Sequence, residues 1–119
     1  HASDYPASVV YHEDKFFVLY DSHNYVKVFN NEGLYLYDIG KEESCAGQLF
    51  CFGIKLTIDS FNNLIVCDNN DGRLQVFSLD GKFIYSFNVG IKSPWSVTAF
   101  EHNKLLVYDY KKHVIHVLQ

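Results

Sequence analysis

The sequence lacks methionine altogether and has only one tryptophan, two prolines and three cysteines among its 119 residues. Its longest uninterrupted apolar run is about five residues, far short of the ~20 that a membrane-spanning helix needs. No basic N-terminus precedes an apolar stretch, so we expect neither a secretory signal nor a membrane association. Because the chain opens at His1 without a methionine, we expect it to be processed or to be part of a longer chain.

The three cysteines, Cys45, Cys51 and Cys67, are an odd number. A secreted disulfide scaffold would pair its cysteines and would contain more of them. Their spacing includes no C-x-x-C and matches no zinc pattern. We therefore expect free thiols in a reducing, cytoplasmic compartment, with a Cys45–Cys51 disulfide in an exported protein as the alternative.

Charge is scarce and unevenly spread. The net charge of −4 argues against a globally basic nucleic-acid binder. Residues 1–52 hold eight acidic residues and three lysines, net −5, whereas residues 53–119 hold six acidic and seven basic residues, net +1. This split is consistent with halves that meet different partners, and equally with an ordinary solvated face.

Short runs rich in β-branched and aromatic residues recur along the chain, separated by turn residues. No window of about twelve residues keeps the apolar spacing of a helix. The chain is therefore predicted to be all-β. The expected strands lie at 7–11, 15–20, 25–29, 34–39, 54–59, 64–67, 73–78, 82–89, 95–100, 104–109 and 113–118.

These runs fall into three units with matching landmarks. Each unit has a chain-bending residue, then an apolar residue that opens its first strand, then an Asp that closes its second strand. The landmarks are Pro6, Val9 and Asp21; Gly53, Leu56 and Asp68; and Pro94, Val97 and Asp109. The Asp residues are 47 and 41 positions apart, and turn glycines follow the third strands at Gly33 and Gly81.

A repeat of this size with four short antiparallel strands is typical of one β-propeller blade. We predict a propeller segment of about three four-stranded blades, at 6–50, 53–91 and 94–119, the last lacking its outer strand. The runs LIVC at 64–67 and LLVY at 105–108 are almost wholly apolar, which predicts strands sandwiched between neighbouring blades.

The segment IVCDNNDGRLQVFSLDGKFIYSF at 65–87 resembles the core of an NHL repeat. The matching residues are Val66, Asp68, Arg73, Leu74, Gln75, Val76, Phe77 and Gly81. SPWSV at 93–97 is similar to the family's Y-P-W-G-V, with Ser96 in place of Gly, and Tyr25 and His113 stand near the Arg73 position. The resemblance implies an NHL-repeat propeller like those of tripartite-motif ubiquitin ligases and related translational repressors.

Members of that family usually close six blades, and three blades leave an open arc. Such an arc exposes two apolar faces and unpaired strand edges. We expect the chain to be a fragment of a longer protein, or to close the ring with a second copy, because two sets of three blades make six. A ring of several copies is the third possibility.

The residue pattern indicates no catalytic or metal site, and we expect no enzymatic activity and no cofactor. His113 and His116 lie on one predicted strand with two residues between them, so they should point to opposite faces. His1, His12, His23 and His102 fall in termini or turns. Adjacent acids, at Glu13-Asp14 and Glu42-Glu43, lie in expected turns, which suits solubility. Asp21, Asp68 and Asp109 are expected to accept N–H bonds from the turns that follow them.

The resemblance also implies a minor alternative, because the family is similar to zinc-dependent peptidyl-hydroxyglycine lyases. That chemistry needs several inward-facing histidines from different blades. The histidines of this sequence are out of register with its repeat.

The expected function is binding through the loops that lead into the first strands and the turns that follow the second strands. The candidate residues are Tyr5, His23, Asn24, Tyr25, Phe52, Asn70, Arg73, Lys92, Trp95, Lys111, Lys112 and His113. The acidic first half favours a protein partner, with the chain as a scaffold module of a larger cytoplasmic regulator. The alternative partner is single-stranded RNA, whose bases stack on aromatics while Lys and Arg neutralise its phosphates. Structural roles for Trp95, packed between blades, and for Lys111-Lys112, in a solvated turn, also remain open.

Overall fold

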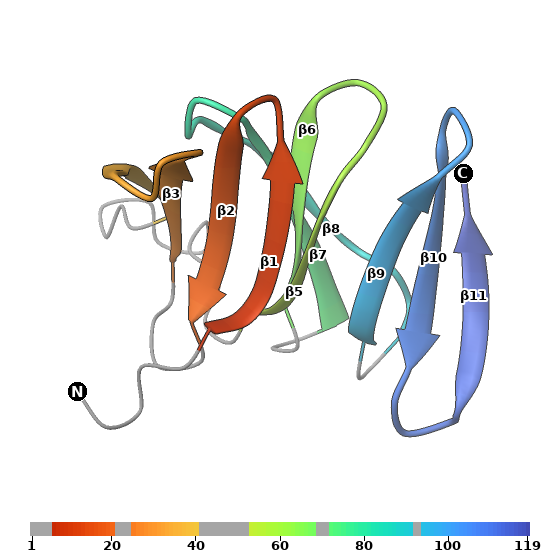
Figure 1. Cartoon of the computed structure of the whole chain (residues 1–119). Coiled ribbons are helices and arrows are strands. Elements are labelled where there is room, and N and C mark those ends of the chain that lie inside the picture. The colour runs from red at the N-terminus through yellow and green to blue at the C-terminus, as the bar shows by residue number, and fades with distance from the viewer. Residues whose placement is uncertain (1–5, 21–24, 41–52, 69–71, 92–93) are drawn as a thin grey trace.

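Three antiparallel sheets make up the computed structural model of the chain, which describes residues 6–20, 25–40, 53–68, 72–91 and 94–119 (Figure 1). We call them blades 1, 2 and 3. Blade 1 has β1 (Pro6–His12), β2 (Lys15–Tyr20), β3 (Val26–Asn30) and β4 (Tyr35–Ile39). Blade 2 has β5 (Gly53–Ile58), β6 (Asn63–Asp68), β7 (Arg73–Ser78) and β8 (Phe83–Asn88). Blade 3 has β9 (Pro94–Phe100), β10 (Lys104–Asp109) and β11 (Val114–Leu118).

The all-β prediction is confirmed, and each predicted strand end lies within one residue of the observed one. The strands of each blade are ordered as they follow in the chain, and blade 3 has three strands rather than four. No helix of the described residues is long and apolar enough to cross a membrane.

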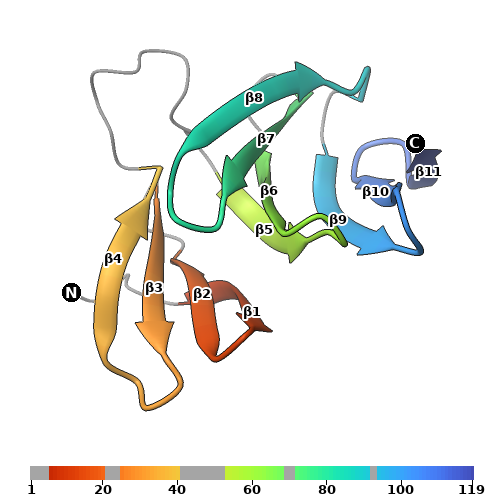
Figure 2. The ribbon, with the colours of Figure 1, turned by 90° about the horizontal axis from the view of Figure 1, so that it is seen from above.

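The first strands of the three blades, β1, β5 and β9, lie side by side (Figure 2). A side-chain hydroxyl bridges each step between them. Ser8 Oγ accepts a hydrogen bond of 3.2 Å from the backbone N–H of Leu56, and Thr57 Oγ1 accepts one of 3.1 Å from Ala99. These bonds fix the height of one blade against the next.

Strand pairing corrects one landmark of the repeat. Gly53 pairs with Asp68 and Pro94 pairs with Asp109, as the spacing predicts, but Pro6 pairs with Tyr20 rather than with Asp21. The β1–β2 connection is one residue shorter than its counterparts. Its two central residues, Glu13 and Asp14, both have positive φ, as a tight two-residue hairpin requires.

The third strands show a related shift. Val26 pairs with Leu19, Leu74 with Cys67 and Ile115 with Tyr108, so these three residues are equivalent. Tyr25 and Val114 therefore occupy the Arg73 position. His113, expected near the Arg73 position, lies one residue before it: it precedes the strand and matches Gly72. Both have positive φ, 56° for His113 and 65° for Gly72.

Two apolar clusters hold the blades together. The first, between blades 1 and 2, contains Phe17, Leu19, Val26, Val28, Ile39, Leu56, Leu64, Val66 and Phe77. The second, between blades 2 and 3, contains Ile65, Cys67, Leu74, Val76, Ile91, Val97 and Val107. Cys67 is a buried free thiol, whereas Cys45 and Cys51 lie outside the described residues.

Strand β6 divides its side chains between the two clusters. Leu64 and Val66 pack toward blade 1, whereas Ile65 and Cys67 pack toward blade 3. This confirms that the LIVC run is sandwiched between blades. The parallel expectation for LLVY in β10 holds on one side only: Val107 packs on blade 2, while the side of Leu106 and Tyr108 has no blade against it in the described structure.

Candidate ligand-binding face

One end of the sheets gathers the starts of β1, β5 and β9 and the ends of β2, β6 and β10, at the bottom of Figure 1. We call this end the loop face. Of the candidate binding residues, the structure describes Tyr25, Arg73, Trp95, Lys111, Lys112 and His113 at this end. Tyr5, His23, Asn24, Phe52, Asn70 and Lys92 lie outside the described residues.

Trp95 and Tyr110 form a stacked aromatic pair on the loop face of blade 3. Their ring centroids are 4.8 Å apart and their planes are 27° from parallel. The two residues are 42% and 50% exposed, and neither belongs to a buried cluster. Trp95 is the extra residue of a β-bulge, because Pro94 pairs with Asp109 and Ser96 with the adjacent Tyr108. The bulge re-aims the indole toward the turn that follows β10.

The turn that carries Tyr110 is anchored by Asp109, which is only 3% exposed. Its carboxylate Oδ1 accepts hydrogen bonds from the backbone N–H groups of Lys111, at 3.1 Å, and Lys112, at 3.2 Å. Its carbonyl oxygen accepts a third, at 2.8 Å, from His113. The expected turn-capping role is thus confirmed for Asp109. Asp21 and the side chain of Asp68 lie outside the described residues.

His113 lies beside the stacked pair of Trp95 and Tyr110. Its Nδ1 lies 3.0 Å from the hydroxyl of Tyr108, and its ring centroid lies 6.3 Å from that of Tyr110. Lys111 and Lys112 are exposed on the same turn. Tyr108 and Tyr110 are not among the binding residues predicted from the sequence. The signal in the sequence that could have identified them is an aromatic residue on each side of Asp109, the Asp that ends the second strand of blade 3.

Tyr25 and Arg73 occupy equivalent positions at the starts of β3 and β7. Tyr25 is half-buried and packs against the first cluster, and Arg73 pairs in register with Asp68 and Asn88. Both are thus partly engaged within their blades. The loop face of blade 3 carries the exposed aromatic surface among the candidates that the structure describes.

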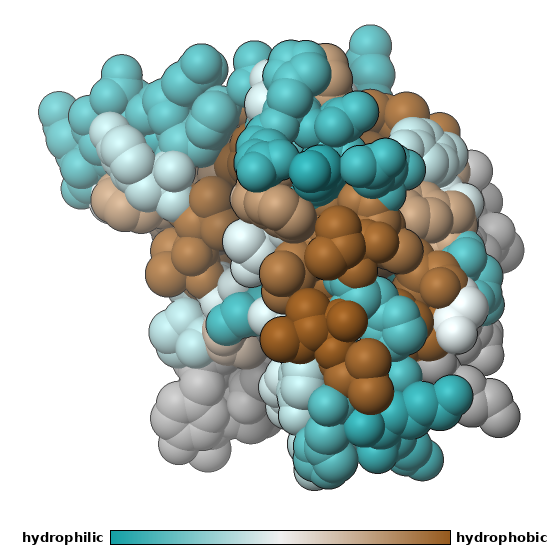
Figure 3. All heavy atoms as spheres, turned by 90° about the vertical axis from the view of Figure 1, so that its right-hand side faces the viewer, coloured by the Kyte–Doolittle hydropathy of each residue, from teal (hydrophilic) through white to brown (hydrophobic). Residues whose placement is uncertain are grey.

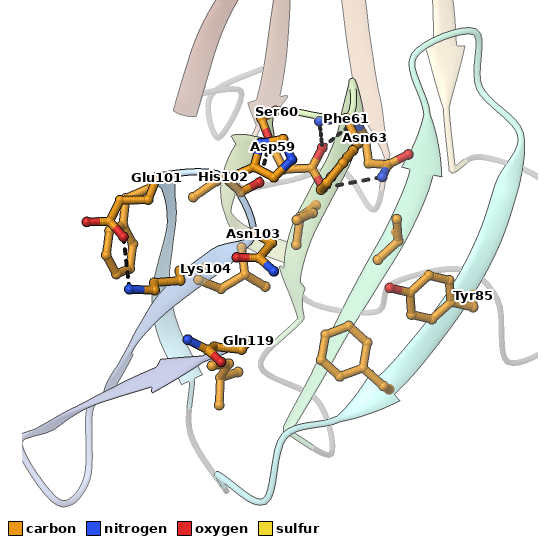
Figure 4. A pocket seen from close by; sticks show the side chains of 17 residues that line it. Asp59, Ser60, Phe61, Asn63, Tyr85, Glu101, His102, Asn103, Lys104 and Gln119 are labelled. Carbon is orange, nitrogen blue, oxygen red and sulfur yellow. Dashed lines mark hydrogen bonds and ion pairs between the residues drawn. The ribbon is translucent and has the colours of Figure 1, made fainter.

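A hollow of about 240 Å³ lies between blades 2 and 3, at the end opposite the loop face (Figure 4). Asp59, Phe61, His102 and Tyr85 are among the residues that line it. Its charged groups are already engaged: Asp59 Oδ1 accepts N–H bonds from Phe61 and Asn63, and Lys104 pairs with Glu101 at 2.9 Å.

A smaller hollow of about 180 Å³ lies at the matching place between blades 1 and 2, where Leu79 and Asp80 form part of its wall. The larger hollow is therefore an inter-blade gap of the repeat and offers no distinctive chemistry.

No group of three or more His, Cys, Asp or Glu side chains that could hold a metal ion occurs among the described residues. His113 lies in a turn rather than on β11, so the alternation argument does not apply to it. His12 ends β1, while His102 lies in the β9–β10 turn.

A family model described as a 6-bladed beta-propeller matches residues 4–116. The chain belongs to this six-bladed β-propeller family. The three blades described above are therefore part of a propeller, as the repeat predicts.

Curated relatives agree with the NHL-type resemblance. The chain is 24% identical over 102 residues to the E3 ubiquitin-protein ligase NHLRC1 of Rattus norvegicus, and 24% identical to that of Mus musculus. These matches span 86% of the chain but only 26% and 25% of the relatives. The chain thus spans about a quarter of their length.

Solved structures share the fold at low identity. Virginiamycin B lyase from Staphylococcus aureus superimposes with a TM-score of 0.75 at 11% identity, covering 100% of this chain and 39% of that one. Hydrazine synthase of Kuenenia stuttgartiensis gives a TM-score of 0.66 at 12% identity, covering 93% and 34%. These likenesses concern the fold alone.

Proposed function

We propose that this propeller segment is a non-catalytic binding module that holds a protein partner on its loop face. The observation that carries the proposal is the Trp95–Tyr110 stack, which is about half exposed although aromatic side chains of this size favour burial. Tryptophan and tyrosine are enriched among the hot-spot residues that contribute most of the binding energy of protein interfaces. A paired indole and phenol on an anchored turn give a large contact area at little entropic cost.

The stack sits on preorganised backbone. Asp109 ties down the turn of Tyr110 through three hydrogen bonds, and the β9 bulge sets the direction of Trp95. Neither ring needs to rearrange to meet a partner. In blade 1 the bulge position is held by Ala7, which remains exposed although blade 2 packs beside it. The exposure of Ala7 supports the proposal that the equivalent position of blade 3, which holds Trp95, stays accessible when a neighbouring blade is present.

The propeller would serve as one module of a larger cytoplasmic regulatory protein, such as a ubiquitin ligase. The support is the similarity to NHLRC1, whose name describes an E3 ubiquitin-protein ligase. Because the chain spans about a quarter of those relatives, the ligase role would belong to the whole protein, with this segment choosing the partner.

Single-stranded RNA is the second candidate ligand of the loop face. Lys111 and Lys112 are exposed directly beside the stack, and aromatic rings flanked by cations bind bases and phosphates together. The net charge of −4 weighs against it. A lyase activity is a weaker candidate, because the histidines of the sequence are out of register with its repeat.

Selection of a displayed library of random peptides on the purified chain tests the protein-binding proposal. We expect enriched peptides that bind the wild-type chain, lose at least tenfold in affinity with Trp95→Ala or Tyr110→Ala, and keep their affinity with Phe61→Ala. Phe61 is the matched control because it is an exposed aromatic, at 55%, at the opposite end of the sheets.

Binding of the chain to a randomised single-stranded RNA pool tests the alternative ligand. Binding that falls with salt and is abolished by Lys111→Glu/Lys112→Glu, with no peptide enriched, would overturn the proposal in favour of RNA. Peptides that bind Trp95→Ala as tightly as wild type would place the protein site elsewhere and also overturn it.

A further inference from the structure

The charged side chains of blade 3 differ in whether they already have a partner. At the end opposite the loop face, Lys104 Nζ lies 2.9 Å from Glu101 Oε1 in an ion pair. Asp109 is 3% exposed, and its carboxylate caps the β10–β11 turn. Lys111 and Lys112 are the other Lys, Arg, Asp or Glu residues of 94–119, and neither forms an ion pair within the described part of the chain. Two positive charges are thus left uncompensated on the turn that carries the aromatic stack.

The backbone of this turn keeps both lysines next to the stack. The N–H groups of Lys111 and Lys112 donate to Asp109 Oδ1, so neither residue can move away without breaking a bond to a buried carboxylate. Lys111 directly follows Tyr110, and both lysines are exposed. Figure 3 shows hydrophilic side chains gathered at this lower end of the molecule, below the hydrophobic side chains of the same view. The anchored turn therefore presents both ammonium groups to solvent beside an aromatic surface.

Aromatic rings continue from the stack along the turn. The ring centroid of His113 lies 6.3 Å from that of Tyr110 and 6.5 Å from that of Tyr108. The 3.0 Å contact between His113 Nδ1 and the Tyr108 hydroxyl fixes the orientation of the imidazole. The surface thus combines rings that an apolar side chain can cover with cations that attract negative charge. We call Trp95, Tyr110, Lys111, Lys112 and His113 the aromatic–lysine site.

Building on the proposed protein-binding function, we propose that the aromatic–lysine site binds an acidic peptide segment of the partner. An apolar side chain of that segment lies on the stack, and carboxylates beside it pair with Lys111 and Lys112. The rings supply most of the affinity, because exposed Trp and Tyr give a large contact area at an interface. The lysines supply the choice of partner and speed the encounter, because complementary charge acts mainly on specificity and association rate.

The geometry of the stack favours a peptide over a nucleic-acid strand. Trp95 and Tyr110 already stack on each other, with centroids 4.8 Å apart, so no base can insert between them. A nucleic-acid strand also carries a phosphate at every nucleotide and needs cations along its path. On blade 2, Arg73 at the start of β7 is half-buried within its own blade. Two adjacent lysines on one turn match a short run of carboxylates better than a long chain of phosphates.

Three displayed peptide libraries test the proposal. All three have a random apolar residue at the centre, and they differ in the residues that flank it: Asp and Glu, Asn and Gln, or Lys and Arg. We expect the purified chain to enrich the acidic library above the other two. The enriched peptides should bind less tightly as salt is raised, since the lysines are exposed and screened. They should also lose binding when their central residue is replaced by glycine, because charge alone does not hold them.

Substitution of the lysines measures their contribution. Lys111→Ala and Lys112→Ala should each weaken binding of an enriched acidic peptide about threefold, the usual effect of one exposed ion pair. Lys111→Glu/Lys112→Glu should weaken it at least tenfold, because attraction becomes repulsion. The matched control is Lys82→Glu/Lys104→Glu, which changes the net charge equally at the end opposite the loop face and should leave the affinity unchanged. Circular dichroism of every variant checks that the blades remain folded.

A charge swap gives the decisive comparison. The Lys111→Glu/Lys112→Glu chain should enrich the basic library in place of the acidic one. The basic peptides it enriches should lose at least tenfold in affinity when Trp95→Ala is added, as the acidic peptides do with the wild-type lysines. This reversal would show that the lysines choose the charge of the ligand while the stack binds its apolar residue. A reversed chain that still prefers acidic peptides overturns the proposal.

The remaining outcomes separate this proposal from the broader one. Peptides that depend on Trp95 but come equally from the neutral library, and that tolerate both lysine variants, overturn the acidic ligand and leave the protein-binding function standing. The absence of any peptide that depends on Trp95 overturns both proposals. Binding of a randomised single-stranded RNA pool that is lost with Lys111→Glu/Lys112→Glu, with no enrichment of the acidic library, overturns the acidic peptide in favour of RNA.

Discussion

The hydroxyl of Tyr37 in blade 1 donates a hydrogen bond of 2.8 Å to the carbonyl oxygen of Leu79 in blade 2. This bond joins the outer strand of one blade to a turn of the next. Partial burial of the phenol and the nearby carboxylate of Asp80 raise the pKa of Tyr37 above its usual value. The matching tyrosine of blade 2, Tyr85, is 52% exposed.

Tyr37→Phe should lower the free energy of unfolding by about 1 kcal/mol at neutral pH, because the Leu79 carbonyl loses its partner. The raised pKa means that folding favours the neutral phenol. The contribution of Tyr37 is therefore present below the unfolded pKa of about 10 and is lost as pH rises through the higher folded value. Urea unfolding between neutral pH and about pH 11 should show the gap between wild type and Tyr37→Phe closing at the alkaline end. Tyr85→Phe is the control and should leave stability unchanged.

Leu64→Ala tests the core between blades 1 and 2. Leu64 is fully buried in the first cluster, so its removal should cost about 2–5 kcal/mol through lost transfer energy and a residual cavity. Leu34→Ala, at a position 61% exposed, should cost less than about 0.5 kcal/mol. Denaturant midpoints of the two variants provide the comparison. Equal losses would mean that the blades do not pack through this cluster.

Asp109→Ala should loosen the Tyr110 turn, because two backbone N–H groups lose their carboxylate acceptor. The expected loss of stability is about 1–2 kcal/mol. Trp95 is the sole tryptophan, so its fluorescence reports the stack directly. We expect Asp109→Ala to shift the emission toward that of Tyr110→Ala, while Asp109→Asn, which keeps an acceptor oxygen, stays close to wild type. An unchanged spectrum in Asp109→Ala would show that the turn holds Tyr110 without its cap.

The sequence was sufficient to predict the strands and the repeat, because each hairpin carries its own turn residues and apolar alternation. It misplaced Asp21 by one position, since the length of the β1–β2 turn depends on the positive φ of Glu13 and Asp14 rather than on any Gly or Pro. Tyr110 escaped notice because its partner, Trp95, lies fifteen residues earlier and reaches it only through a bulge. Contacts of that kind are set by strand register, which composition does not encode.

The last prediction concerns the backbone conformation of the β3–β4 and β7–β8 turns. Both place a glycine at positive φ, Gly33 at 87° and Gly81 at 104°, and in each the glycine N–H bonds to the carbonyl three residues back. A Cβ on Gly81 would lie 3.7 Å from Asp38 O and Ile39 Cγ1, an ordinary contact, so the cost of Gly81→Ala comes from the backbone. We expect a loss of about 1–2 kcal/mol for Gly81→Ala. Gly81→Asn should lose less, because asparagine tolerates the left-handed region. Equal stability of wild type and Gly81→Ala in urea unfolding would show that this turn is free to adopt another conformation.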